Sequence, residues 1–357
     1  MSPELDQELD PQQFLERLPR AHGAPVIRAV FKQEPEDFQV DEELGWSPSG
    51  QGEHLCLHVR KRGISTLEVA RRLAEAADLP RRSVSYAGLK DRQSVSRQWF
   101  SLHLPGREDP DFSGLEGGGE LWIESAQRNH RKLRRGTHQA NHFRIRLREV
   151  EGAEDALAAR IENIRQHGVP NYFGAQRFGH DAVNVRAALR WFAGDYRPRS
   201  RNERSLLLSA ARSFLFNAVL ARRVTEGSWN RALPGERLML EGSNSRFSAE
   251  PDDPQLAQRL AAGDVHPGGV LWGRGEPDSS GEVRNLELAT VQQWPLLARG
   301  LEEKGLEQAR RSLRFHVGDL HWARSDGQTL CLEFRLPPGV YATTVLRELY
   351  TGTETGE

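Results

Sequence analysis

The residues around Asp91 are the strongest candidates for chemistry in this chain. Asp91 lies in the segment Tyr86-Ala-Gly-Leu-Lys-Asp-Arg92, between a lysine and an arginine, and no other acidic residue occurs between residues 79 and 107. Nearby opposite charges favour the ionised form of an acid, so we expect a carboxylate at neutral pH. A single carboxylate in a basic neighbourhood suits attack on, or polarisation of, an electron-poor carbon next to phosphates. It does not suit glycosidase chemistry, which uses a pair of acids.

Three other kinds of site find little support. His54, Cys56 and His58 would share one face of a strand, and imidazole and thiolate are zinc ligands. No fourth ligand is evident, so we interpret them as packing residues and expect no metal. Gly117-Gly-Gly119 lacks the Lys-Ser/Thr and the helix start of a phosphate-binding loop, and we interpret it as a hairpin turn. No serine lies in a Gly-x-Ser-x-Gly elbow, so a Ser/His/Asp hydrolase is not indicated.

Basic residues are concentrated in one stretch, although the net charge of the chain is −1. Residues 125–148 contain no acid and eight basic residues, which are Arg128, Arg131, Lys132, Arg134, Arg135, Arg144, Arg146 and Arg148. Residues 58–62 form a second basic cluster. Segregated positive charge is typical of a surface that binds a polyanion. The alternative is that these are ordinary solvated faces of strands and loops.

Several aromatic residues lie close to cations or amides in the sequence. They are Phe38, Trp99, Phe100, Phe143, Tyr172, Phe173 and Phe178. An enzyme that acts on a nucleobase takes the base out of its stack and holds it, commonly against an aromatic ring, while cations bind the phosphates. The alternative is that these rings belong to the core.

Composition limits the class of protein. Hydrophobic residues make up 37 % of the 357 residues, which is sufficient for a core and compatible with two domains. No apolar run approaches the roughly 20 residues that span a bilayer. The acidic N-terminus does not resemble a secretory signal, and two cysteines favour a reducing compartment. We therefore expect a cytoplasmic protein.

The elements that would position Asp91 are strands and one helix. Residues 54–59 and 141–150 alternate between apolar and polar side chains, and further strands are expected at 97–104, at 120–125 and at 24–40, the last broken at Glu34-Pro35. Ser65 or Thr66 can cap a helix that ends near residue 78, with Leu67, Ala70, Leu73 and Ala74 on its buried face.

The pattern changes after about residue 152. Helices are expected at 153–166 and 206–224, and short helices separated by Gly/Pro-rich connections at 226–310. Strands return at 314–321 and 329–336, followed by a helix from about residue 342. The pattern predicts an α+β protein in which a helix-rich insertion interrupts a strand-rich domain.

Two motifs of this chain resemble those of a known family. The segment Tyr86–Arg92 resembles the catalytic motif of the TruD family of tRNA pseudouridine synthases, and Lys32-Gln-Glu-Pro-Glu-Asp-Phe38 resembles the N-terminal signature of the same family. Further matches occur in family order between about residues 27 and 350. They are Gly52-Glu-His-Leu55, Arg131-Lys-Leu-Arg134, Asn141-His-Phe143, Val169-Pro-Asn-Tyr-Phe-Gly-Ala-Gln-Arg-Phe-Gly179, Asn202-Glu-Arg-Ser205, Ser209-Ala-Ala-Arg212, Leu336-Pro-x-Gly339 and Thr344-Val-Leu-Arg-Glu-Leu349.

The resemblance implies a fold and a domain division. The fold would be a pseudouridine synthase catalytic domain with a mixed β-sheet flanked by helices, together with a mainly helical insertion. The catalytic domain would be discontinuous, over residues 26–166 and 316–357, with the insertion at 167–315 and a leader at 1–25.

The resemblance also implies an activity: the cofactor-free isomerisation of uridine 13 of tRNA to pseudouridine. Asp91 matches the family's essential aspartate. Its role stays open between attack at C1′, attack at C6 and removal of a ribose proton. The partner would be tRNA, in the region of its D-arm, with no membrane and no obligate protein partner.

The other site residues follow from the same resemblance. Lys32, Phe38, Asn141, Phe143 and Tyr341 would bind the substrate, and Lys90 and Arg92 would support Asp91. Asn141 would bond to the edge of the uracil or orient Asp91, Phe38 or Phe143 would stack on the base, and Lys32 would lie near Asp91 or a phosphate. Tyr341 stands where related sequences usually have phenylalanine, which adds a hydroxyl that needs a partner.

Two alternative functions use the same residues. A tRNA-binding module or RNA chaperone would use the basic surface without chemistry, but a carboxylate among phosphates would only weaken its binding. A nucleosidase or phosphodiesterase would release uracil or cut the strand, whereas isomerisation conserves mass.

Overall fold

The computed structural model describes residues 10–243, 245–249 and 253–354, which form two compact units. The first, here called the sheet unit, comprises Pro25–Ile161, Val317–Ala342 and Leu349–Glu357. The second, the helical unit, comprises Met1–Ala24, Glu162–His316 and Thr343–Glu348. Strand-rich segments before residue 161 and after residue 317 therefore build one unit, and most of the chain between them builds the other.

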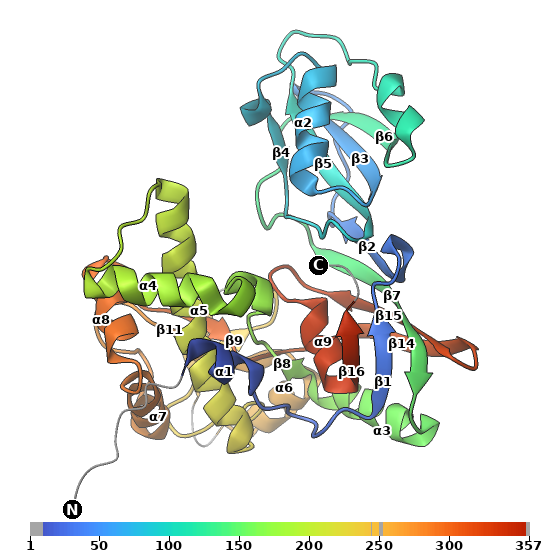
Figure 1. Cartoon of the computed structure of the whole chain (residues 1–357). Helices are drawn as coiled ribbons and strands as arrows, with labels where there is room; N and C mark the ends of the chain where they lie inside the picture. Colours follow the sequence, from blue (N-terminus) through green and yellow to red (C-terminus); the bar gives the residue numbers. More distant parts are fainter. Residues whose placement is uncertain (1–9, 244, 250–252, 355–357) are drawn as a thin grey trace, which may run out of the picture. The chain divides into compact units, whose positions relative to one another are not determined.

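The sheet unit is built on a mixed ten-stranded sheet, which confirms the expected α+β class (Figure 1). Its main path runs in the order β14-β15-β7-β2-β5-β3-β6, with β1 beside β7, β16 beside β1 and β4 beside β5. The β2–β5 and β1–β16 pairs are parallel. The strands are β1 Ile27–Phe31, β2 Phe38–Glu43, β3 His54–Arg62, β4 Val84–Tyr86, β5 Val95–His103, β6 Leu121–Asn129, β7 Ala140–Glu151, β14 Gly318–Asp326, β15 Thr329–Leu336 and β16 Tyr350–Glu354.

The alternating pattern of β7 explains its central place in the sheet. Phe143, Ile145 and Leu147 are buried on one face, and Arg144 is exposed on the other. Val40 of β2 pairs with Phe143, and Leu332 of β15 pairs with Ile145, so three neighbouring strands bury their apolar residues on the same face. The polar alternate residues of these strands form the opposite face.

Helix α2, Thr66–Ala76, packs on the strands that carry the Asp91 loop. Ser65 caps the helix, because its Oγ accepts a hydrogen bond from the Glu68 N–H at 3.2 Å. The predicted buried face is wrong at one position: Leu67 is 44 % exposed, and Val69 is buried instead. The i, i+3, i+4 spacing places Val69, Leu73 and Ala70 on one face, and Leu67 falls outside it. The core beneath α2 includes Leu57 of β3.

Two further helices lie close to their predicted positions. Helix α3 spans Glu154–His167 and α9 spans Ala342–Leu349. Short 3₁₀ turns occur at η1 Pro35–Asp37, η2 Arg81–Ser83, η3 Ser113–Gly118, η4 Ala175–Arg177 and η5 His180–Ala182. Residues 117–119 therefore end a 3₁₀ turn rather than joining two paired strands.

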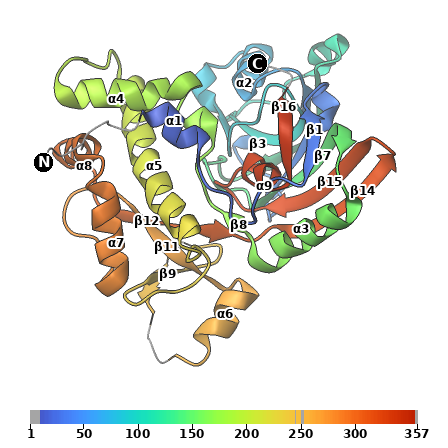
Figure 2. The ribbon, with the colours of Figure 1, turned by 60° about the horizontal axis from the view of Figure 1, so that its bottom comes forward.

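The helical unit is organised around α5, Arg201–Thr225, a long helix that α4, α7 and α8 contact (Figure 2). The helices are α1 Pro11–Glu16, α4 Val183–Ala193, α6 Leu256–Ala262, α7 Gly281–Val291 and α8 Pro295–Glu303. Residues 10–24 are held in this unit, because Phe14 packs with its ring 5.1 Å from that of Phe214 and 5.9 Å from that of Trp294. Residues 1–9 of the expected leader lie outside the described residues.

The helical unit also contains strands, most of which the sequence did not predict; the exception is β13, Arg314–Phe315, which falls within the strand expected at 314–321. A four-stranded sheet runs in the order β10-β9-β11-β12, and β8 pairs with β13. These strands are β8 Val169–Pro170, β9 Arg237–Leu240, β10 Arg246–Ser248, β11 Val265–Leu271, β12 Ala309–Ser312 and β13 Arg314–Phe315. Among the described residues, no helix combines the length and apolar character that a membrane crossing requires.

Candidate active site around Asp91

Asp91 lies on the loop of residues 87–94, which connects β4 to β5 within the sheet unit. Buried polar side chains beneath this loop fix its backbone. Gln98 is fully buried and donates from Nε2 to the carbonyl of Gly88 at 2.5 Å. The hydroxyl of Thr66 donates to Gln98 Oε1 at 3.0 Å and accepts from the N–H of Lys90 at 2.9 Å. The loop is therefore attached to both α2 and β5.

The main-chain carbonyl of Asp91 accepts two further hydrogen bonds. Lys61 Nζ donates at 2.6 Å and Ser94 Oγ at 2.8 Å. Lys61 is fully buried, and this burial lowers the pKa of its ammonium to about 8, an effect that the charge of Asp91 partly opposes. Because a buried ammonium is costly without acceptors, its direct contact with Asp91 indicates a positioning role.

The carboxylate of Asp91 is held at both oxygens. Lys32 Nζ lies 2.8 Å from Oδ2, and the N–H of Gln93 donates to Oδ1 at 3.0 Å. The side chain of Asp91 remains 20 % exposed, whereas that of Lys32 is only 5 % exposed. A substrate can therefore reach the carboxylate of Asp91 more easily than the ammonium of Lys32.

Lys32 reaches Asp91 from an unusual backbone conformation. It directly follows β1 and has a φ of 57°, in the left-handed region that non-glycine residues seldom adopt. Its ammonium lies 4.9 Å from the ring centroid of Phe38 and 5.2 Å from that of Phe31. Both rings therefore contribute cation–π attraction to the Lys32 ammonium.

Lys90 is not paired with Asp91; its ammonium serves a neighbouring group. Nζ donates to Glu42 Oε2 at 2.6 Å and to Asn141 Oδ1 at 2.7 Å. The other oxygen of Glu42 accepts from the N–H of Trp99 at 3.2 Å. The supporting role expected for Lys90 is therefore directed at Asn141 and at the buried Glu42.

The orientation of the Asn141 amide follows from these partners. A lysine can only donate, so the amide oxygen must face Lys90 and the amide nitrogen must face His138 Nε2, at 3.1 Å. Burial, and secondarily the charge of Lys90, lower the pKa of His138. A neutral His138 accepts the amide hydrogen at Nε2 and carries its own proton on Nδ1. Asn141 is fixed at both ends, and its bonds within the described part of the chain leave one lone pair and one N–H for a further partner.

Two of the predicted aromatic residues, Phe38 and Phe143, form a row along the sheet together with Phe334. Phe38 and Phe143 lie parallel with centroids 6.0 Å apart, and Phe143 and Phe334 with centroids 5.4 Å apart. Phe38 and Phe143 are only 7 % and 9 % exposed. Tyr341 directly precedes α9 and is partly exposed. A contact of any of these rings with a base stays a prediction.

Arg92 contacts the backbone of another loop and is not among the partners of the Asp91 carboxylate that the structure describes. Its side chain is exposed, and Nε approaches the carbonyl of Gly63 at 3.5 Å, which is a weak contact. Of the two expected supporting cations, neither contacts the Asp91 carboxylate, and Lys32 occupies that position instead.

Sequence reasoning missed Glu42, Lys61, Thr66 and Gln98 as parts of this site. A signal was present, because each strand places a polar residue in register with buried apolar ones. Lys61 continues the inward series Leu55, Leu57, Val59, and Gln98 precedes Phe100 on the same face of β5. A polar residue in such a position needs a buried partner, and the partner here is the Asp91 loop.

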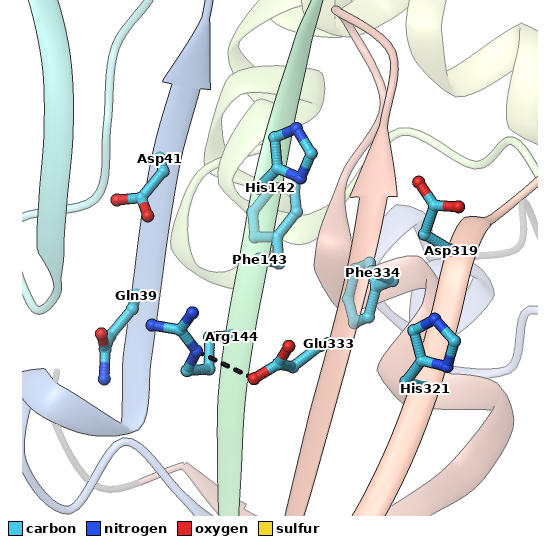
Figure 3. A pocket seen from close by; sticks show the side chains of 9 residues that line it. All are labelled: Gln39, Asp41, His142, Phe143, Arg144, Asp319, His321, Glu333 and Phe334. Atoms are coloured by element: carbon cyan, nitrogen blue, oxygen red, sulfur yellow. Dashed lines mark hydrogen bonds and ion pairs between the residues drawn. The ribbon is translucent and has the colours of Figure 1, made fainter.

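A separate shallow hollow lies over β2, β7, β14 and β15, outside the Asp91 network (Figure 3). Its lining is mostly polar, and Figure 3 shows Arg144 and Glu333 of neighbouring strands forming an ion pair at 2.9 Å. Of the predicted site residues, only Phe143 lines it. Half-exposed ion pairs that satisfy each other are weak candidates for chemistry.

The arrangement around Asp91 can therefore present one anchored, accessible carboxylate. The nearby acid, Glu42, is fully buried in its ion pair with Lys90 and does not form a catalytic pair with Asp91. Such a site fits nucleophilic or proton-abstracting chemistry by one acid.

Comparison with known proteins gives a consistent result. The family model for tRNA pseudouridine synthase D (TruD) matches residues 19–197 and 192–349. The chain is 50 % identical to the tRNA pseudouridine synthase D of Methylococcus capsulatus over 332 residues, covering 93 % of this chain and 94 % of that protein. It is 52 % identical to that of Pseudomonas putida strain W619 over 334 residues, with the same coverage.

A solved structure shares the fold. The crystal structure of the putative tRNA pseudouridine synthase D from Methanosarcina mazei superposes with a TM-score of 0.70 and 21 % identity, covering 92 % of this chain and 95 % of that one. The family match extends over most of the chain and includes the Asp91 loop. This chain belongs to the tRNA pseudouridine synthase D (TruD) family.

Proposed function

We propose that this protein is a cytoplasmic tRNA pseudouridine synthase that isomerises uridine 13 of tRNA, with Asp91 as the essential carboxylate. In this reaction the N1–C1′ bond of uridine breaks, the uracil turns while held, and C5 bonds to C1′. The proton on C5 is lost, and N1 acquires a proton, so the product has the mass of the substrate. The reaction needs no cofactor.

The anchoring of Asp91 is the observation that carries this proposal. The carboxylate is oriented by Lys32 at 2.8 Å and by the Gln93 N–H at 3.0 Å, on a backbone that Lys61 and Ser94 hold from below. A reacting group fixed by packing and buried hydrogen bonds costs less to orient when the substrate arrives. One such acid supports attack at C1′, attack at C6 or removal of a ribose proton, and the proposal leaves these three steps open.

The proposed substrate contacts use hydrogen-bonding groups and rings that the site leaves for a ligand. Asn141 has a free lone pair and a free N–H after its bonds to Lys90 and His138, which match the donor and acceptor groups on the edge of uracil. Phe38 or Phe143 would stack on the base after a modest opening of the row of rings, and Tyr341 would contact the substrate from the start of α9. Lys32 would hold Asp91, and Lys90 would hold Asn141.

Exposed basic residues support the choice of an RNA substrate. Arg131, Lys132, Arg134 and Arg135 are exposed on the loop between β6 and β7, in the same unit as Asp91. Exposed cations on a loop are accessible to the phosphates of an RNA backbone. The family's name identifies tRNA as the substrate of the matched relatives.

The test is to map modified uridines in tRNA incubated with the purified protein. Pseudouridine at position 13, with no free uracil and no strand cleavage, is the expected result. Free uracil would indicate a nucleosidase and a cut strand a phosphodiesterase. Bound but unaltered tRNA would indicate a binding module. Pseudouridine at another position alone would refute the choice of uridine 13 while leaving the reaction type intact.

A further inference from the structure

A second candidate site lies within the helical unit, in a pocket over α5 that the Asp91 chemistry does not use. It is lined by Phe173, Ser205, Leu208, Ser209, Arg212, Ser213, Leu271 and Leu306. The lining combines an arginine, three hydroxyls and four apolar side chains, and none of these residues is acidic. An acid-free pocket of this composition matches a ligand that is anionic at one end and apolar at the other.

Arg212 supplies the positive charge of this pocket. Its Nη2 donates to the main-chain carbonyl of Leu271 at 2.9 Å and also to that of Glu307. Its Nε is buried and has no hydrogen-bond partner among the described residues. Carbonyl groups orient the guanidinium but do not neutralise it, so an anion in this pocket would meet a positive charge.

Phe173 forms the aromatic part of the pocket, and a buried residue holds it in place. The side chain of Asn217 is fully buried, accepts from the N–H of Phe173 at 2.9 Å and donates to its carbonyl at 3.0 Å. The ring itself stays only partly buried. A buried amide that is used to fix a partly exposed ring indicates that the position of the ring matters.

Two more arginines surround the same ring. The guanidinium of Arg311 lies 4.3 Å from the ring centroid of Phe173 and that of Arg177 lies 5.5 Å from it. Arg177 also donates to Ser209 Oγ at 2.9 Å, and Arg311 donates to Asn171 Oδ1 at 2.5 Å. Two arginines therefore lie against Phe173 and a third, Arg212, lines the same pocket, which places several positive charges in this region.

We propose that this pocket binds one nucleotide unit of the substrate RNA, with the phosphate at Arg212 and the base or ribose against Phe173 and the leucines. The proposal rests on the proposed function, because it takes RNA as the substrate. Arginine with serine hydroxyls is a common phosphate-binding set, and aromatic and arginine planes accept any base by stacking. The helical unit would thus contribute a binding site that is separate in residues from the Asp91 loop.

The test introduces one negative charge into the pocket. Ser205 lines the pocket and is exposed near the start of α5, where an acid is well tolerated by the helix dipole. In Ser205→Asp the new carboxylate competes with the phosphate for Arg212. We expect the Kd for tRNA to rise by about tenfold or more and the slope of log affinity against log salt to become shallower by about one. With active enzyme, KM rises while kcat at saturating tRNA is kept.

Leu206→Asp is the matched control. The substitution adds the same charge one residue further along α5, about 100° round the helix. Leu206 is exposed and does not line the pocket. It should bind tRNA within about twofold of the wild type, since a single exposed charge is well screened. Thermal unfolding of both variants verifies that they fold equally well.

The outcomes separate this proposal from the proposed function. If Ser205→Asp and Leu206→Asp bind tRNA equally well, the pocket does not contact RNA, even when the wild type forms pseudouridine. If the wild type forms no pseudouridine, the proposed function fails, and the difference in binding still decides the role of the pocket. Titration with UMP and with inorganic phosphate provides the last arm: tight binding of either that leaves tRNA binding unaffected would overturn the proposal in favour of a free small ligand.

Discussion

At the scale of single residues, the site is organised by buried polar groups around one partly accessible acid, Asp91. Lys61, Gln98 and Thr66 are buried and use their hydrogen bonds on the backbone of the Asp91 loop. Among the described residues, Lys32 is the cation that pairs with the carboxylate. This division lets one acid act while its surroundings stay fixed.

Lys61 gives a pH-dependent prediction. Burial lowers the pKa of Lys61 to about 8, so its ammonium is charged below that pH and neutral above it. The neutral amine holds the Asp91 carbonyl more weakly, and we expect the rate of pseudouridine formation at saturating tRNA to fall as the pH rises through about 8. In Lys61→Met the rate should be lower by on the order of tenfold to a hundredfold, without this alkaline decrease.

Lys304→Met is the control for this profile, because Lys304 lies in the helical unit beside Trp191. It should keep the rate and the alkaline decrease of the wild type. A Lys61→Met enzyme with the wild-type rate and pH profile would show that Lys61 is only a packing residue.

At the scale of elements, α2 links the stability of the sheet unit to the site. The helix begins at Thr66, whose hydroxyl holds the N–H of Lys90, and Ser65 caps that same end. Ser65→Ala removes the cap and should lower the free energy of unfolding by about 1 kcal/mol. Chemical denaturation measures this change, with Ser65→Asp, which retains a capping oxygen, as the control. An unchanged unfolding free energy in Ser65→Ala would mean that the cap does not stabilise α2.

The sequence predicted the elements of the sheet unit better than those of the helical unit. The strand β7 alternates cleanly, and α2 carries a capping residue before an amphipathic run, so both follow from local patterns. By contrast, β11 contains Pro267, Gly268 and Gly269, which disfavour a strand when the sequence is read locally. Its pairing with β9 and β12 stabilises it nonetheless.

Long-range pairing limits what the sequence predicts of the site. β1, near the start of the chain, pairs with β16, near its end, and no local sequence pattern indicates this partner. Asp91 was identified from its own motif, but its contact with Lys32 required the fold to bring β1 beside the loop. The family resemblance supplied Lys32 as a site residue, whereas Lys61 and Glu42 emerged only from their buried contacts.

At the scale of the whole molecule, the two units divide the proposed tasks. The sheet unit holds the Asp91 site and the exposed basic loop, and the helical unit holds the Phe173 pocket. Both carry cations that face solvent, although the chain as a whole has a net charge of −1. Binding of RNA is thus expected to depend on where the charges are placed and not on their sum.

Salt dependence tests this distribution. If about four of the basic residues near 128–148 meet phosphates, log affinity for tRNA should fall with log salt at a slope of roughly −3 to −4. Fluorescence anisotropy with labelled tRNA between low and physiological salt measures the slope. A combined Arg131→Gln and Arg134→Gln variant should make it shallower by about two. A slope near zero for the wild type would exclude the basic loop as an RNA contact.

The most direct measurement of the central claim uses Asp91→Asn, which keeps the size of the side chain and removes its charge. Pseudouridine in tRNA is quantified by mass spectrometry, and tRNA binding is measured on the same preparation. If Asp91 is the essential carboxylate, product formation should be abolished, while tRNA binds as tightly as to the wild type or more tightly. Pseudouridine formation by Asp91→Asn at a rate close to that of the wild type would contradict the account.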